Sequence, residues 1–523
     1  MRSSVYKEVG LASVVMMASV FLSRVIGLLR EMAIAYMAGV GPEVDAYQIA
    51  FILPEILNHA AATGFLSVTF IPLFIRHLQD DSESEAWRIF SIILSVFGSL
   101  ALAMVVCSMA LAPDLVALAA PGVHDPQTLA LAVRMTRIIL PAQFFFFAGG
   151  LLMAVQFARE RFLLPALAPL IYNLGIILGG VLLGPWIGIE GFAWGVLAGA
   201  FSGNFLLQVS GARRVGMRFF PAWQWSHPDV KEYLRLTLPL MLGLTMTFST
   251  EFLFRFFGSY LPAGSIAVLN FSLRVMLILV GIFGQAVGTA SFPYMAQLAA
   301  ENHLDDLNHL LNRTLSYLAL VMPVAALLSV LSPEVVSILF QRGRFDSAAV
   351  RVTADVLVWF LSGAVAFAAY TVIVRAYYAT QNTLFPALFG SAAVLISIPL
   401  YPLGMAWMGV EGVALAVSVS GILQAGVLFV LWSRRSGNRG RGEIFRFYLK
   451  IGGVSAGLAL VLAPVRAATV AWVDPSSLIG SLVVSAVVGL VFIGLMLTAG
   501  YGLKIGEIQR VAEYLLGKLR SKN

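Results

Sequence analysis

Long apolar stretches recur along the whole chain, separated by short clusters of charged residues and by Gly/Pro breaks. A helix that crosses the hydrocarbon core of a bilayer needs about 20 mostly apolar residues, and most of these stretches are at least that long. They predict an all-α polytopic membrane protein with fourteen transmembrane helices and a short amphipathic tail. The expected spans are 9–40, 44–76, 86–112, 127–157, 162–183, 188–212, 233–260, 264–299, 307–340, 347–379, 384–407, 410–433, 447–472 and 477–502.

Composition supports this interpretation and narrows the functional classes. Of 523 residues, 59% are hydrophobic and 12% are charged, about half of the roughly 25% charged residues of a soluble domain. This excludes an ordinary cytosolic enzyme, a nucleic-acid-binding module and a disordered scaffold. The single cysteine, Cys107, excludes an intramolecular disulfide and a cysteine metal cluster. The six histidines show no metal-binding spacing and there is no nucleotide-binding loop, so we expect neither catalysis nor a cofactor.

The basic residues indicate the orientation in the membrane. With the N-terminus in the cytoplasm, most of the 34 Lys and Arg lie in cytoplasmic segments, as the positive-inside rule requires. The two most basic connections contain Arg213, Arg214, Arg218, Lys231 and Arg235, and Arg434, Arg435, Arg439, Arg441 and Arg446. The outer side holds only Arg134, Arg137, Arg342, Arg344, Arg351 and Arg466. Both termini are therefore expected in the cytoplasm.

The two halves of the chain resemble each other at a fixed offset of 221 residues. The run PAL at residues 165–167 recurs at 386–388, GIEG at 188–191 recurs as GVEG at 409–412, and Pro72 corresponds to Pro293. Six spans in each repeat keep the repeats in the same orientation, which predicts two lobes with a cavity between them, as in many transporters. The expected domains are an N-lobe (1–215), a cytoplasmic linker (216–232), a C-lobe (233–433), a basic loop (434–446) and two extra helices with the tail (447–523).

Several charged or polar residues lie inside the predicted spans, where a charge costs about 2.5–3.5 kcal/mol on insertion scales. They are Arg24, Arg30, Glu31, Asp45, Glu55, Asn58, His59, Glu251, Arg255 and Arg274. Glu31 beside Arg30, and Glu251 four residues before Arg255, are expected to form internal ion pairs. Arg24 and Arg274 have no carboxylate within one turn of their own helices, so we expect them to be unpaired in a shared hydrated cavity. Guanidinium groups there would bind a bidentate anion such as phosphate.

Other conspicuous residues are expected to be structural. Glu190 and Glu411 open predicted helices, where a carboxylate offsets the helix dipole. Glycines recur every four residues at 191, 195, 199 and 203, which predicts a close-packing ridge. His59 is a candidate pH sensor, with a structural role as the alternative.

Four sequence runs resemble motifs of the MurJ (MviN) family of lipid II flippases, within the MOP exporter superfamily. These are SRVIGLLRE at 23–31; DAYQIAF at 45–51 with Leu53-Pro54 and FIP at 70–72; LFQRGRFD at 339–346; and AYYATQNT at 376–383. The resemblance covers nearly the whole chain and implies an inner-membrane flippase that moves lipid II, an undecaprenyl-pyrophosphate-linked peptidoglycan precursor, to the outer leaflet. By position, Arg24, Arg30 and Arg274 match arginines thought to hold the pyrophosphate, and Asp45 matches a functional acid. In that family the two extra helices form a groove for the lipid tail.

The sequence departs from the family pattern near these positions. Asn58 and His59 stand where many relatives have arginines, and are therefore included among the candidate substrate-binding residues. Leu273 and Leu277 replace acids that often flank the counterpart of Arg274. Another polyprenyl-linked glycan therefore remains open as the substrate.

Relatives with a sodium site carry an acid near the position of Phe254, and Glu251, one turn earlier, is the candidate replacement for ion coupling. Membrane potential and a monovalent cation both remain open as driving forces.

The predicted function is alternating-access transport of lipid II by a monomer. One rival is a drug/cation antiporter of the same superfamily, which would be expected to have an acidic cavity. A second is a non-transporting membrane scaffold of the cell-wall machinery. A third, a membrane glycosyltransferase, lacks an acidic or metal-binding loop.

Overall fold

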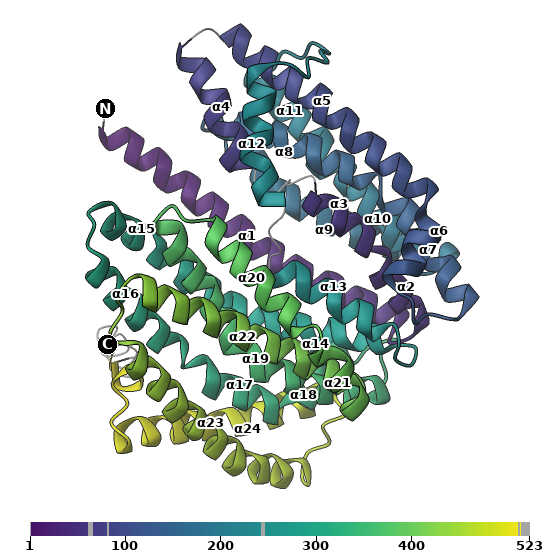
Figure 1. Cartoon of the computed structure of the whole chain (residues 1–523). Coiled ribbons are helices and arrows are strands. Elements are labelled where there is room, and N and C mark those ends of the chain that lie inside the picture. The colour runs from purple at the N-terminus through teal and green to yellow at the C-terminus, as the bar shows by residue number, and fades with distance from the viewer. Residues whose placement is uncertain (1, 61–65, 81–82, 242–245, 511–512, 514–523) are drawn as a thin grey trace. The chain divides into compact units, whose positions relative to one another are not determined.

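The computed structural model of the chain describes residues 2–60, 66–80, 83–241, 246–510 and 513, and every regular element in them is helical (Figure 1). The predicted all-α fold is confirmed. The chain forms two compact units, Met1–Gly243 with Pro262–Ala267, and Leu244–Leu261 with Val268–Asn523. The predicted tail follows residue 502, and its residues 511–512 and 514–523 lie outside the described residues.

The helices up to residue 241 all belong to the first unit, and most of them lie at predicted spans. They are α1 (Arg2–Ala38), α2 (Pro42–Ala50), α3 (Ile52–Ala60), α4 (Leu66–Asp80), α5 (Glu83–Ala110), α6 (Ala112–Ala119), α7 (Pro126–Ile139), α8 (Ala142–Ala158), α9 (Leu163–Ile187), α10 (Glu190–Gly199), α11 (Leu207–Arg214) and α12 (Pro228–Met241). A π-helical segment, Ala200–Leu206, joins α10 to α11.

The remaining helices belong to the second unit, apart from the first three residues of α14. They are α13 (Met246–Gly258), α14 (Ser265–Val280), α15 (Ala286–Ala300), α16 (Leu304–Leu318), α17 (Val321–Val330), α18 (Ser332–Phe340), α19 (Ser347–Ala379), α20 (Leu384–Ser397), α21 (Leu400–Met408), α22 (Val410–Arg435), α23 (Arg441–Val470) and α24 (Leu478–Gly502). A second π-helical segment, Gly281–Gln285, joins α14 to α15.

Eleven stretches of the described chain are helical, long and apolar enough to cross a membrane, and each lies at a predicted span. The predicted spans 9–40, 44–76 and 233–260 are not among them. Two of these three include residues outside the described part, 61–65 and 242–245. The total of fourteen spans therefore stays a prediction.

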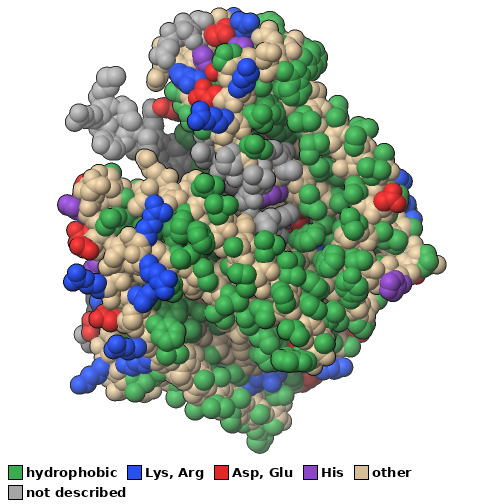
Figure 2. All heavy atoms as spheres, in the orientation of Figure 1, with side chains coloured by type: hydrophobic (Ala, Val, Ile, Leu, Met, Phe, Trp, Pro, Cys, Tyr) green, Lys and Arg blue, Asp and Glu red, His purple; other side chains and the backbone are tan. Residues whose placement is uncertain are grey.

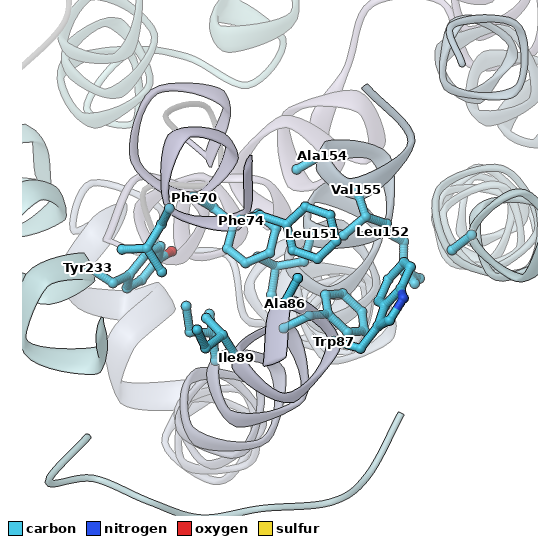
Figure 3. Packing of buried hydrophobic residues seen from close by; sticks show 14 of the residues in the cluster. Phe70, Phe74, Ala86, Trp87, Ile89, Leu151, Leu152, Ala154, Val155 and Tyr233 are labelled. Carbon is cyan, nitrogen blue, oxygen red and sulfur yellow. The ribbon is translucent and has the colours of Figure 1, made fainter. Parts of the chain in front are cut away.

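The helix α12 groups with the first compact unit, which includes residues 233–241. The predicted lobe bounds, with a C-lobe that begins at residue 233, stay a prediction. Here Tyr233 packs in a buried cluster with Phe70, Phe74 and Trp87 (Figure 3). Arg76, on α4, adds ion pairs to the start of α12, with Glu232 at 2.8 Å and Asp229 at 3.0 Å. These contacts hold α12 against α4.

The outer surface is largely apolar. In Figure 2 most visible side chains are hydrophobic, and the charged ones gather in a few clusters. Many large hydrophobic residues are strongly exposed, including Trp186 at 80% and Trp407 at 83%. Exposed apolar surface on this scale is suited to contact with lipid rather than water. The protein is thus a polytopic membrane protein.

The internal repeat is visible in the backbone. Trp186 and Trp407, again 221 residues apart, are each followed two residues later by a glycine with φ near +60°, Gly188 and Gly409. A left-handed glycine at each site ends one helix and lets the next begin at once. The two segments thus repeat the same helix–turn–helix geometry.

The glycine ridge is confirmed as a packing surface. A Cβ added at Gly191, Gly195, Gly199 or Gly203 would lie 2.6–2.9 Å from a backbone oxygen of α9, closer than atoms of this kind can approach. The absence of side chains therefore allows α10 and the π-helical segment after it to pack backbone against backbone on α9.

Gly412→Ala, at the repeat equivalent of Gly191, is expected to lower the stability of the second unit by about 1–3 kcal/mol. A Cβ on Gly412 would overlap the carbonyl group of Gly404 on α21. Thermal unfolding of the purified protein in detergent measures the effect. Gly426→Ala is the matched control, because Gly426 lies on the same helix with open space around its Cβ position. An equal effect of both substitutions would contradict this packing.

Candidate functional site

In the first unit, Arg30 is held by two neighbours inside the helical bundle. Its guanidinium group donates to Glu31 at 2.5 Å and to the side-chain oxygen of Asn173, on α9, at 3.1 Å. Asn173 in turn donates to the carbonyl of Pro169 and to the hydroxyl of Ser23. The predicted Arg30–Glu31 ion pair is confirmed. Asn173 was missed by the sequence analysis, although an amide side chain within an apolar helix was an available signal.

Arg24 lies on the same helix as Arg30, six residues earlier, and is exposed. Arg30 is partly buried, whereas Glu31 is buried. The two arginines of α1 therefore differ in burial, since the side chain of Arg24 is exposed and that of Arg30 is partly buried.

Asn58 and His59, the residues that replace family arginines, lie at the end of α3 and are both partly buried. Asn58 donates from its amide to the side-chain oxygen of Gln143, on α8, at 3.2 Å. This neutral amide pair connects α3 to α8 without requiring a counter-charge. Gln143 was not identified from the sequence.

Asp45 has a structural partner that the sequence did not indicate. Its carboxylate is buried and accepts the backbone N–H groups of Gly264 at 2.5 Å and Ala267 at 2.7 Å. Gly264, with φ +93°, directly precedes α14 and has no side chain to cap it. Asp45 therefore caps the N-terminus of α14 from α2, where a negative charge also offsets the helix dipole.

Asp45→Ala is expected to cost about 0.5–2 kcal/mol of stability, the range for removal of a helix cap. The stability of Asp45→Asn should lie between those of Asp45→Ala and the wild type. Its amide keeps one acceptor oxygen for one backbone N–H but presents N–H donors to the other. Thermal unfolding of the purified variants measures the order. If Asp45→Ala unfolds at the wild-type temperature, the capping role is wrong.

In the second unit, Glu251 lies between two arginines. It accepts from Arg255 at 3.0 Å, on the same helix, and from Arg274, on α14, at 3.2 Å. The predicted Glu251–Arg255 ion pair is confirmed. The expectation that Arg274 is unpaired is wrong, because its guanidinium group reaches the Glu251 carboxylate from a different helix, α14. The spacing of residues along one helix predicts contacts within that helix only, so it did not reveal this contact between two helices.

A small gap between side chains, too narrow to hold a water molecule, lies beside this ion-pair cluster. It is lined by Thr250, Glu251, Leu273, Leu277 and Phe367. Leu273 and Leu277, which replace acids of the family pattern, thus make the wall beside Glu251 apolar. Phe254 is fully buried. Within the described residues no group of three or more His, Cys, Asp or Glu side chains is placed to hold a metal ion.

A further buried ion pair was not predicted. Glu334, on α18, is fully buried and contacts Arg466, on α23, through two atoms of the guanidinium group at 2.8 and 2.9 Å. It fastens the first of the two extra helices to α18. The sequence contained both charges, but their partnership depends on packing of segments 132 residues apart.

Comparison with known proteins places this arrangement in a family. The model of the family described as lipid II flippase MurJ matches residues 34–485. A probable lipid II flippase MurJ of Bdellovibrio bacteriovorus is 26% identical over 465 residues, covering 87% of this chain and 88% of the relative. The lipid II flippase MurJ of Burkholderia cenocepacia is 27% identical over 451 residues, covering 84% and 86%.

Solved structures agree in fold. A lipid II flippase MurJ in an inward closed conformation matches with a TM-score of 0.74 and 23% identity, covering 94% of this chain and all of that one. An inward-facing multidrug resistance MATE transporter of the MOP superfamily matches with a TM-score of 0.65 and 14% identity, covering 81% and 98%. The family model spans most of the chain, and the chain belongs to the lipid II flippase MurJ family.

Proposed function

We propose that this protein is a lipid II flippase, a transporter that moves the lipid-linked peptidoglycan precursor from the inner to the outer leaflet. The observation that carries the proposal is the family match over residues 34–485. The arginine clusters of the two units support it, because each places a guanidinium group on an apolar helix.

Arg24, Arg30 and Arg274 are proposed to bind the pyrophosphate of the substrate. A guanidinium group presents parallel N–H donors that match two phosphate oxygens. Asn173 and Glu31 orient Arg30, and Glu251 orients Arg274. The substrate phosphate would compete with Glu251 for Arg274, so binding replaces one anion by another instead of leaving a charge without a partner.

Transport is proposed to follow alternating access, in which binding must not favour one end state strongly, because a ligand that does so traps the protein there. Competition from Glu251 and Glu31 weakens the hold of the arginines on the substrate and helps its release. Asn58 and His59, which replace arginines of relatives, would contact the substrate as neutral hydrogen-bonding groups.

Glu251 is the candidate ion-coupling residue, but its carboxylate already contacts two arginines. A monovalent cation bound at Glu251 would have to displace the guanidinium groups of Arg255 and Arg274 from its carboxylate. This competition favours a role for Glu251 in positioning the two arginines. Membrane potential is then the alternative driving force for transport.

The proposal places the chain in the bacterial inner membrane as a monomer with both termini in the cytoplasm. The asymmetry of Lys and Arg between alternate connections supports the cytoplasmic location of the termini.

The test is rescue of a bacterium depleted of its own lipid II flippase, with exposure of lipid II in the outer leaflet as the readout. Restored growth together with restored exposure is expected. Growth without restored exposure would favour a scaffold of the cell-wall machinery. Failure of a well-inserted protein to restore either would indicate another polyprenyl-linked glycan and would contradict the proposal.

A further inference from the structure

The connection between α11 and α12 is an ordered, non-helical segment that carries four exposed aromatic side chains. Residues 215–227 have no regular secondary structure. The exposed fractions are 43% for Phe219, 60% for Phe220, 61% for Trp223 and 55% for Trp225. Exposing four large aromatic rings to water is unfavourable, so this surface requires an apolar partner.

The backbone of this segment is fastened to α5. Phe220 donates its backbone N–H to the hydroxyl of Ser91 at 3.1 Å, and Ala222 donates to that of Ser95 at 3.2 Å. Ser91 and Ser95 are both buried, and Ala222 packs beside Ile92 and Val96 of the same helix. The segment therefore lies along α5, and Figure 1 shows it as the loop between α11 and α12. Its four aromatic side chains are exposed.

The contact lies within a candidate membrane span. The span Glu83–Ala110 begins with charged residues, and Ser91 and Ser95 follow eight and twelve residues after Glu83. Arg88 is the last charged residue before the apolar stretch, and Ser91 and Ser95 lie three and seven residues beyond it, about 4.5 and 10.5 Å along the helix at 1.5 Å per residue. The headgroup layer is about 5–8 Å thick, so these serines lie near the boundary between headgroups and acyl chains. Irregular backbone can lie at this depth only if its polar groups are satisfied, and the two serine hydroxyls do this for two N–H groups.

Basic residues surround the aromatic side chains. Arg213 and Arg214 end α11, Arg218 precedes Phe219, and Lys231 and Arg235 lie on α12; all five are exposed. None of the five forms an ion pair within the part of the chain that the structure describes. Aromatic rings flanked by unpaired cations are complementary to the interface of an anionic membrane.

We infer that residues 213–235 form an interfacial anchor that binds anionic phospholipids of the cytoplasmic leaflet. Phe219, Phe220, Trp223 and Trp225 insert at the acyl boundary, while Arg213, Arg214 and Arg218 contact the lipid phosphates. The inference rests on the cytoplasmic placement proposed above. It concerns bulk phospholipid, so it is tested without lipid II and can fail or succeed independently of transport.

The first experiment measures the depth of the segment. In full-length Cys107→Ser protein, Trp223→Cys carries a spin label, and Arg439→Cys in the second basic connection is the control. Both are reconstituted in nanodiscs containing phosphatidylglycerol. The label at 223 is expected to be accessible to oxygen and protected from a water-soluble nickel reagent, unlike the label at 439. Equal nickel accessibility at both positions would overturn the inference, as would protection at 223 that appears only in native membranes, which would indicate a protein partner.

The second experiment measures lipid preference. The triple variant Arg213→Gln, Arg214→Gln, Arg218→Gln is compared with the charge-preserving Arg→Lys triple variant by counting retained anionic and zwitterionic lipids in native mass spectrometry. Each arginine removed is expected to weaken the preference for anionic lipid about fivefold, whereas the lysine variant keeps most of it. A glutamine variant with the wild-type preference would overturn the assignment of the arginines.

Discussion

Glu251→Ala is expected to destabilise the second unit by about 3–5 kcal/mol, the cost of removing one partner from a buried ion pair. Arg255 is only 1% exposed, and its guanidinium group contacts the Glu251 carboxylate at 3.0 Å. Arg274 contacts the same carboxylate from α14. The substitution therefore removes the negative charge that balances two cations in a poorly hydrated place, where water cannot replace it.

Thermal unfolding of the purified protein in detergent measures this effect. Glu251→Gln is the isosteric control and should be destabilised as well, because it keeps an acceptor but not the charge. The double variant Glu251→Leu, Arg255→Met should recover part of the loss, since an apolar pair can replace a buried ion pair at little cost. A Glu251→Ala protein as stable as the wild type would contradict the ion-pair geometry.

Arg466→Ala is expected to have an effect of similar size, about 3–5 kcal/mol, because it leaves the Glu334 carboxylate buried without the guanidinium group that contacts it. Glu334 has 0% side-chain exposure, and both of its oxygens accept from Arg466. Loss of this contact should loosen α23 from α18, although Val335 of α18 still packs against an apolar cluster that includes Leu458 of α23 and Val484 of α24.

The matched control for Arg466→Ala is Arg134→Ala. Arg134 also pairs with a glutamate, Glu190, at 3.0 Å, but its side chain is 57% exposed. An exposed ion pair contributes only about 0–1 kcal/mol. The thermal unfolding temperature should therefore fall clearly for Arg466→Ala and little for Arg134→Ala. Equal falls in unfolding temperature for the two variants would contradict this account, because the contribution of an ion pair to stability would then not depend on its burial.

Helix positions were predictable because the membrane fixes the length of an apolar stretch. The predicted span 347–379 corresponds to α19, and the span 410–433 lies within α22, which continues to Arg435. Interruptions within spans were not predictable. The predicted span 127–157 is divided between α7 and α8, where Pro141 follows the end of α7, and the span 188–212 contains the π-helical segment. Such breaks depend on how neighbouring helices satisfy the backbone.

The sequence predicted which charged residues lie in the candidate site, but it did not predict which residues they contact in other helices. A charge within an apolar stretch is visible in sequence, as for Arg30 and Arg274, because insertion scales assign it a cost. Pairs within one helix, such as Glu251 with Arg255, followed from helical spacing. The contacts of Glu251 with Arg274, and of Asp45 with α14, join residues of different helices. The packing of the helices decides these partners. The spacing of residues along the sequence does not show which helices pack together.

The most direct test of the account is lipid II exposure in cells depleted of their own flippase and carrying Arg24→Ala, Arg30→Ala or Arg274→Ala, with Arg439→Ala as the control outside the predicted spans. We predict that each of the three variants inserts at the wild-type level but loses exposure of lipid II in the outer leaflet, whereas the control keeps it. Wild-type exposure in all three variants would contradict binding of the pyrophosphate by these arginines.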